Sequence, residues 1–259
     1  GGVNARKAGT KVVLVNPYRE PGMERYWVPS IPESALFGTK IAGDTFLVSQ
    51  GGDIAFLCGA LKHILERDLM DHAFVDAHTT GFSELKASVE AMSWKTLEAN
   101  SGLSEQRMRE FGQLVGTAKT AVFVWSMGVT QHSTGEDGVR IIIDLALTRG
   151  FVGRDMCGLM PIRGHSGIQG GAEMGAYSTA FPGNIAIDPE SAAALGAQWG
   201  FEVPSEKGMI TSEMIDAADE GKLDVLFAAG SNFLEVLPDP DYVDQALGKI
   251  PLRVHQDIV

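Results

Sequence analysis

The sequence predicts an α/β fold of parallel strands joined by crossover helices. Short apolar runs rich in β-branched residues alternate with longer segments in which apolar residues recur every three or four positions, a pattern typical of β-α-β units. The chain has 259 residues, of which 44% are hydrophobic, which is enough to bury one large core or two smaller ones. No apolar run approaches the ~20 residues that cross a bilayer, so no membrane insertion is expected.

The elements of the first half follow from these patterns in chain order. Residues 1–8 resemble the end of a helix, and residues 11–16 (KVVLVN) form an apolar strand that Pro17 ends. A helix is expected from Asp53, which can cap it, because apolar residues recur on one face as far as Leu65. Further along we expect short helices from residues 71 and 83, a helix over 104–117, a fully buried strand over 121–125 (AVFVW) and a helix over 136–149.

A glycine-rich stretch over residues 150–171 separates the two halves. Because it has little hydrophobic periodicity, it is predicted to be an irregular but ordered connection. After it, Asp188 caps a helix that has Pro189 at its first position. The remaining elements are a helix from residue 211, a strand over 223–229, a turn at 230, a helix over 241–248 and a strand over 252–259. Two α/β halves therefore meet near residue 164, and the abrupt ends indicate the central part of a longer protein.

Composition excludes several classes of function. The formal charge is −12 and there is no run of Lys or Arg, so a nucleic acid partner is not expected. Cys58 and Cys157 lack the spacing of a metal cluster or a disulfide framework, and both are interpreted as structural. With no signal peptide pattern, the expected location is cytoplasmic. No Ser-His-Asp arrangement or Walker lysine loop supports a hydrolase or an NTPase.

Two loops that follow predicted strands carry candidate binding residues, because ligands of open α/β sheets bind beyond the carboxyl ends of the strands. In the first (NPYR), Arg19 can stack on or hydrogen-bond a base, although a simple turn also needs Asn and Pro. In the second (SMGVTQH), Gly128 permits close approach of a ligand, and Gln131 and His132 supply donors and acceptors. For His132 alone, a structural role stays open.

Two later loops are further candidates. Residues 161–171 (PIRGHSGIQGG) do not lie between a strand and a helix in the register of a dinucleotide fingerprint, so a classical NAD site is disfavoured. An Arg, a His and a Gln among small residues suit a phosphate, a pterin edge or a small oxyanion, and a merely glycine-rich connection is the alternative. Residues 230–232 (GSN) can present backbone amides to a pyrophosphate.

In this order, the loops resemble the molybdopterin oxidoreductase family (the dimethyl sulfoxide reductase superfamily), most closely its formate-dehydrogenase-like alpha subunits. The matching segments are LVNPYR, residues 50–82, 126–154 and 161–175, PGN, AAGSN and VHQDIV. The resemblance implies two Rossmann-like parallel-sheet domains packed side by side, both incomplete in this chain. Residues 1–163 would be the first dinucleotide-binding domain without its start, and residues 164–259 part of the second.

The resemblance also implies roles for individual residues. Arg163 matches the arginine that lies beside the metal in formate dehydrogenases, and His165 is the second catalytic candidate. The cofactor-binding candidates are Asn16, Arg19 and Asp53 for guanine or ribose, Met127, Gly128, Gln131 and His132 for the pterin, Gly164 and Gln169 in the long loop, and Gly230, Ser231 and Asn232 for the second dinucleotide. The sequence differs from formate dehydrogenases after Arg163, where Gly-His-Ser-Gly replaces Gly-Gln-Asn-Asn, so formate is not implied as the substrate.

The implied cofactor is molybdenum or tungsten bound by two molybdopterin guanine dinucleotides. A 4Fe-4S cluster is expected in the full-length protein, but its ligands and the protein ligand of the metal are not in this chain. A small-molecule substrate and an electron-transfer subunit are the implied partners.

Two alternatives stay open: a nucleotide-binding module without redox chemistry, like the central domain of thiamine-diphosphate enzymes, and a homologue that keeps the fold without the metal. MGVTQH and RGHSGIQGG favour the enzyme, since a simple nucleotide-binding domain has no evident need for them.

Overall fold

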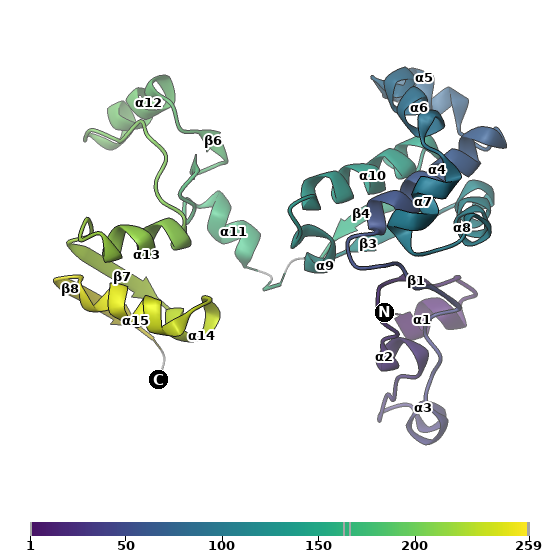
Figure 1. The fold of residues 1–259 in the computed structure, drawn as a ribbon, viewed down its shortest axis with the longest axis horizontal. Helices are drawn as coiled ribbons and strands as arrows, with labels where there is room; N and C mark the ends of the chain where they lie inside the picture. The colour runs from purple at the N-terminus through teal and green to yellow at the C-terminus, as the bar shows by residue number, and fades with distance from the viewer. Residues whose placement is uncertain (1, 163, 166, 258–259) are drawn as a thin grey trace. The chain divides into compact units, whose positions relative to one another are not determined.

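A computed structural model describes residues 2–162, 164–165 and 167–257 (Figure 1). The chain divides into two compact units, Gly1–Gly164 and His165–Val259. The first has two parallel strand pairs and the second has one, each joined by helical crossovers, which confirms the predicted α/β class. No helix of the described residues is long and apolar enough to cross a membrane.

The first unit contains two parallel strand pairs. β1 pairs with β2 from Val13 opposite Asp44, and β3 pairs with β4 from Val122 opposite Gly158. In chain order its elements are α1 (Gly2–Lys7), β1 (Val13–Val15), α2 (Pro21–Glu24), α3 (Pro32–Phe37), β2 (Asp44–Phe46), α4 (Asp53–Glu66), α5 (His72–His78), α6 (Phe82–Ala91), α7 (Trp94–Ser101), α8 (Glu105–Thr117), β3 (Val122–Trp125), α9 (Met127–Thr130), α10 (Gly135–Thr148) and β4 (Gly158–Pro161).

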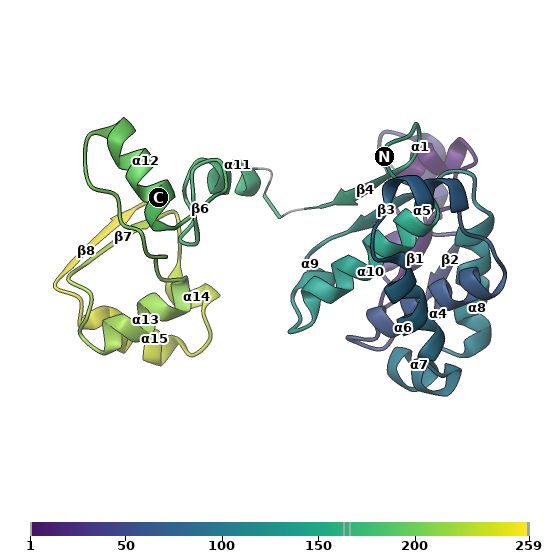
Figure 2. The ribbon, with the colours of Figure 1, turned by 90° about the horizontal axis from the view of Figure 1, so that it is seen from above.

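Helix α4 is the centre of the first core. It packs against α6, α7, α8 and α10, and Figure 2 shows α4 among these helices. Phe56 on α4 is fully buried, and its ring lies 5.4 Å from that of Phe46 and 4.9 Å from that of Phe111. The approach of α4 to α8 is close at Gly112, where an added Cβ would lie 2.6 Å from the Ala60 carbonyl oxygen. Aromatic packing and this close helix contact fix the position of α4.

The second unit is smaller and has its own core, formed by Ile215, Ala218, Val243, Ala246 and Ile250. Its strand pair β7–β8 is parallel, with Val225 opposite Leu252. Its elements are α11 (Ile168–Glu173), β5 (Ala180–Phe181), β6 (Ile185–Ala186), α12 (Pro189–Trp199), α13 (Thr211–Asp219), β7 (Val225–Ala229), α14 (Phe233–Val236), α15 (Pro240–Gly248) and β8 (Leu252–Gln256). The predicted cap of α12 is confirmed, because the Asp188 carboxylate accepts a hydrogen bond from the Ser191 amide at 2.8 Å.

The prediction of an irregular connection over residues 150–171 is wrong in two places. Residues 158–161 form β4, which pairs with β3, and residues 168–173 form α11. A four-residue strand with a glycine and a proline has no local signal, because it owes its conformation to the partner strand. The strand predicted to be fully buried is also partly exposed, since Val122 and Val124 on β3 each retain 52% of their accessible surface.

Candidate functional site

A cavity of about 550 Å3 lies in the first unit, where β1 and β3 end and α4 begins. Although β1 and β3 belong to separate strand pairs, the segments after both strands meet the start of α4 at this cavity. The lining residues are Val15, Asn16, Pro17, Gln50, Gly51, Asp53, Leu57, Phe111, Phe123, Val124, Trp125, Ser126, Gly128, Val129, Gln131, His132 and Ile142. The cavity thus has an apolar part and a polar part.

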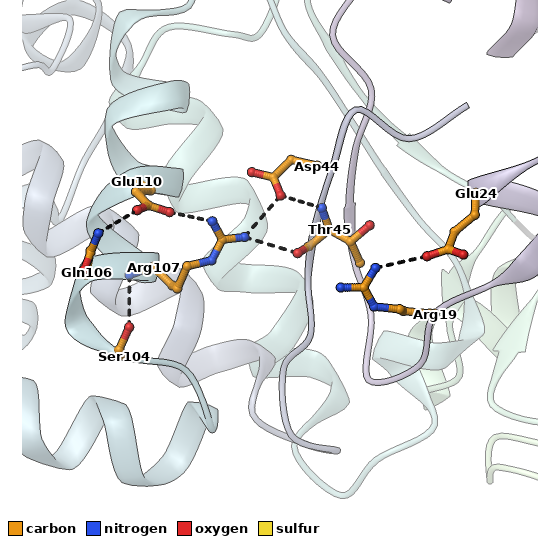
Figure 3. Close-up of polar contacts among 8 residues, drawn as sticks. All are labelled: Arg19, Glu24, Asp44, Thr45, Ser104, Gln106, Arg107 and Glu110. Carbon is orange, nitrogen blue, oxygen red and sulfur yellow. Dashed lines mark hydrogen bonds and ion pairs between the residues drawn. The ribbon is translucent and has the colours of Figure 1, made fainter. Parts of the chain in front are cut away.

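The loop after β1 supplies Asn16 to the cavity. Its side-chain amide donates to the Tyr18 carbonyl at 2.7 Å, and its backbone N–H donates to the Phe46 carbonyl at 3.1 Å. The turn is therefore held by the asparagine itself. Arg19 does not line this cavity: its guanidinium pairs with Glu24 at 3.0 Å beside a different cleft (Figure 3).

Asp53 lies at the start of α4. The expectation that it caps this helix is wrong, because the cap is Gly52 and Asp53 is the first helical residue. The Asp53 side chain is half-buried, and among the described residues it has no hydrogen-bond or ion-pair partner. It lies in the first turn of α4, at the positive end of the helix dipole. Asp53 therefore places an unpaired acceptor at the rim of the cavity.

The segment after β3 also lines the cavity, and it is not a loop throughout, because Met127–Thr130 form the short helix α9. Ser126 ties it to the strand edge, since its hydroxyl donates to the Ile162 carbonyl at 2.7 Å. Gly128 has no atom within 4 Å of the position of an added Cβ, which leaves its side open. Gln131 and His132 line the cavity, and no side-chain partner is found for either in the described part of the chain. Met127 is 46% exposed and does not line the cavity.

The other sequence-predicted residues lie elsewhere. Arg163 is outside the described residues. Gly164 ends the first unit and His165 begins the second, where its side chain is exposed. Gln169 lies on α11 and donates to the Glu173 carboxylate at 3.1 Å.

The Gly-Ser-Asn turn follows β7 in the second unit as predicted. Gly230 has a φ of +62° and donates its N–H to the Gln256 carbonyl at 2.9 Å. Asn232 is the cap residue of α14. The turn therefore lies at a strand end, as the loops of the first unit do.

Gln50 is a polar lining residue that sequence reasoning missed. It directly precedes the glycine pair before Asp53, and a side chain before such a pair could have been recognised as part of the same loop. The apolar part, with Leu57, Phe111 and Phe123, had no separate signal, because these residues also belong to the core or pack on it.

Neither cysteine belongs to a metal centre in the described part of the chain, where no group of three or more His, Cys, Asp or Glu side chains could hold a metal ion. Burial raises the pKa of the Cys58 thiol to about 11, and the Asp144 carboxylate adds to this effect. Cys157 is half-buried and accepts a hydrogen bond from the Arg154 guanidinium at 3.3 Å.

Alkylation should distinguish the two thiols. Because the thiolate is the reactive form, iodoacetamide at neutral pH is expected to modify Cys157 in the folded protein and to leave Cys58 unmodified. In denaturant both should react. Peptide mass spectrometry checks this, and equal modification of the two residues in the folded protein would contradict the assigned burial of Cys58.

Comparisons with known proteins extend over nearly the whole chain. The protein YdeP of Escherichia coli strain K12 is 33% identical over 96% of this chain and 34% of its own length. Formate dehydrogenase H of the same strain is 29% identical over 99% of this chain and 34% of its own length. Acetylene hydratase from Pelobacter acetylenicus aligns with a TM-score of 0.65 at 18% identity, covering 97% of this chain and 35% of that one. No protein-family model matches the chain.

The chain has the α/β fold that acetylene hydratase has over the matching region. Within that class, the chain is a homologue of formate dehydrogenase H, which confirms the resemblance to the formate-dehydrogenase-like molybdopterin oxidoreductases. The chain spans about a third of the length of the relatives it matches.

Proposed function

We propose that the first unit holds the guanosine end of a molybdopterin guanine dinucleotide in a molybdenum- or tungsten-dependent oxidoreductase. The observation that carries this proposal is the cavity at the ends of β1 and β3, with the unpaired Asp53 carboxylate at its rim. The homology to formate dehydrogenase H supports the same class of cofactor.

The residues of the cavity fit a guanosine group. Asp53 can accept hydrogen bonds from the N–H groups of a guanine base or from ribose hydroxyls. The amides of Gln50 and Gln131 supply both donors and acceptors, and Leu57 and Phe111 offer apolar surface to the face of a base. A volume of about 550 Å3 lies within the range of ~300–1,000 Å3 typical of small-molecule sites.

In this proposal, the residues of this chain bind the cofactor and orient it. When bound, the metal cofactor supplies two-electron transfer to or from a small substrate. Gly128 leaves space at the wall of the cavity, and His132 presents a ring nitrogen that can donate or accept. The second unit, with its Gly-Ser-Asn turn after β7, is the proposed holder of the second dinucleotide.

Replacing Asp53 tests the proposal. In the full-length protein, Asp53→Asn should weaken retention of the nucleotide by about tenfold to a hundredfold, since a hydrogen bond to a charged group contributes ~1.5–3 kcal/mol. The readouts are molybdenum and tungsten by mass spectrometry and guanine nucleotide released by acid, each per mole of protein. Asp137→Asn on the exposed side of α10 is the control and should leave both unchanged.

The nucleotide and metal contents together distinguish the proposed enzyme from a nucleotide-binding module. Wild-type cofactor content in Asp53→Asn would contradict the placement of the nucleotide. Wild-type protein that contains a nucleotide but no molybdenum or tungsten, after expression in a host that makes the cofactor, would support a binding module without redox chemistry.

A further inference from the structure

A second cleft, of about 710 Å3, lies in the first unit between residues 19–47 and α8. It shares no lining residue with the cavity at the ends of β1 and β3. Charged side chains dominate its wall, and Figure 3 shows two pairs of them, Arg107 with Asp44 and Arg19 with Glu24. The charged lining residues are Arg19, Glu24, Arg25, Lys40, Asp44 and Arg107.

Two of the four cations, Arg19 and Arg107, pair with the two carboxylates of the wall. Arg19 pairs with Glu24 at 3.0 Å. Arg107 donates to the Asp44 carboxylate and to the Thr45 carbonyl, both at 3.2 Å, and also pairs with Glu110 on its own helix (Figure 3). Arg107 is therefore shared between Asp44 and Glu110. Arg25 and Lys40 are the two cations of the wall that have no carboxylate partner among the described residues.

Arg25 and Lys40 are both exposed and line the same cleft. They flank an antiparallel bridge in which Tyr26 and Thr39 exchange backbone hydrogen bonds of 2.9 and 2.7 Å. The positions that flank such a bridge share one face, and like charges on one face repel each other. Among the described residues, neither cation has a hydrogen-bond or ion-pair partner. An anion between them would remove this repulsion.

Hydrogen bonds to a buried serine hold the segment that carries the two cations. Ser34 on α3 is 2% exposed, and its hydroxyl accepts hydrogen bonds from the Val28 amide at 3.0 Å and the Thr39 hydroxyl at 2.8 Å. Gly38 has a φ of +67°, and an added Cβ there would collide with the Arg25 side chain. The bridge and its glycine therefore set the position of Arg25 before any ligand binds.

We propose that this cleft is a binding site for a phosphate dianion, free or as the terminal group of a small phosphate ester. Two unpaired cations match its two charges, and the planar guanidinium of Arg25 suits two phosphate oxygens at once. The Lys40 ammonium adds a second, compact charge. The site is independent of the proposed dinucleotide site, because the two have no residue in common.

Calorimetric titration of the full-length protein with inorganic phosphate tests the proposal, at low ionic strength and at mildly alkaline pH, where phosphate is doubly charged. Wild-type protein is expected to bind phosphate, and Arg25→Gln or Lys40→Gln to bind it about tenfold more weakly. Arg140→Gln on α10 changes the net charge equally at an exposed position outside the cleft and should bind as wild type does. Absence of phosphate binding to wild type would overturn the proposal, and so would equal affinities in all four proteins.

Two further variants separate binding from folding. Lys40→Arg keeps the charge and should retain phosphate affinity, whereas Gly38→Ala displaces Arg25 and should lose it. Circular dichroism of each variant checks that the unit stays folded, and loss of affinity in Lys40→Arg equal to that in Lys40→Gln would refute a charge-based site. Phenyl phosphate is the second probe: tighter binding than inorganic phosphate indicates an ester, and weaker binding indicates the free anion.

The two proposals can fail separately. Arg25→Gln should keep the wild-type content of guanine nucleotide and metal, and Asp53→Asn should keep the wild-type affinity for phosphate. If Arg25→Gln lost the nucleotide and Asp53→Asn lost phosphate affinity, the two clefts would act as one site, and the independent phosphate site would be overturned.

Discussion

Replacing Phe56 with alanine is expected to lower the free energy of unfolding of the first unit by about 3–5 kcal/mol. The side chain is fully buried on α4, and its ring packs against those of Phe46 and Phe111, which also contact each other. Alanine would leave a cavity that neither ring can fill, because Phe46 belongs to β2 and Phe111 to α8. Denaturant unfolding monitored by circular dichroism measures the change.

The matched control is Phe37→Ala at the end of α3, where the ring is 70% exposed. This variant removes the same atoms from a surface position and should change the free energy of unfolding by less than about 0.5 kcal/mol. Similar losses in the two variants would contradict the central position of α4 in the core.

Elements with a strong hydrophobic period could be predicted from the sequence. The pattern from Ile54 to Leu65 predicted α4 because one face of a helix must be apolar to be buried. Its exact start could not be predicted, because Gly52 caps the helix for a tertiary reason: its neighbours leave no space for a side chain. Because Asp is a common cap residue, the sequence instead favours Asp53, one residue later, as the cap.

Elements that depend on distant partners could not be predicted. Strand β4 has four residues and contains both Gly158 and Pro161, so only its pairing with β3 makes it a strand. Residues 20–43 between β1 and β2 were also missed, although they contain α2 and α3. These helices are short, and each has a proline at its start, so neither shows a helical period.

The candidate site was predictable to the extent that strand ends define it. Asn16 and the 128–132 loop follow strands that were expected from their apolar runs, and the structure brings both to the cavity that Asp53 borders. Arg19 lies only three residues beyond Asn16 but lines the other cleft, because an ion pair with Glu24 on α2 holds it there. Sequence spacing alone cannot predict which of two clefts a residue lines when one loop borders both.

Replacing Gly52 with valine is expected to lower the free energy of unfolding by about 3 kcal/mol or more and to release the nucleotide proposed for the cavity. A Cβ at this position would lie 2.8 Å from the Asn100 carbonyl oxygen and 2.9 Å from those of Ser49 and Ser101. Backbone oxygens cannot rotate away as a side chain can. Either the 49–53 loop or the end of α7 must therefore move, and a move of the loop displaces Asp53.

Gly51→Ala is the control for this prediction. Gly51 has a φ of +75° but no atom within 4 Å of the added Cβ, so alanine there costs only about 1–2 kcal/mol of backbone strain. Guanine nucleotide per mole of protein and the denaturation midpoint are measured for both variants. If steric contact at Gly52 positions Asp53, nucleotide content falls much further in Gly52→Val than in Gly51→Ala. Equal losses would instead mean that the loop conformation at Gly51, and not the packing of Gly52 on α7, positions the carboxylate.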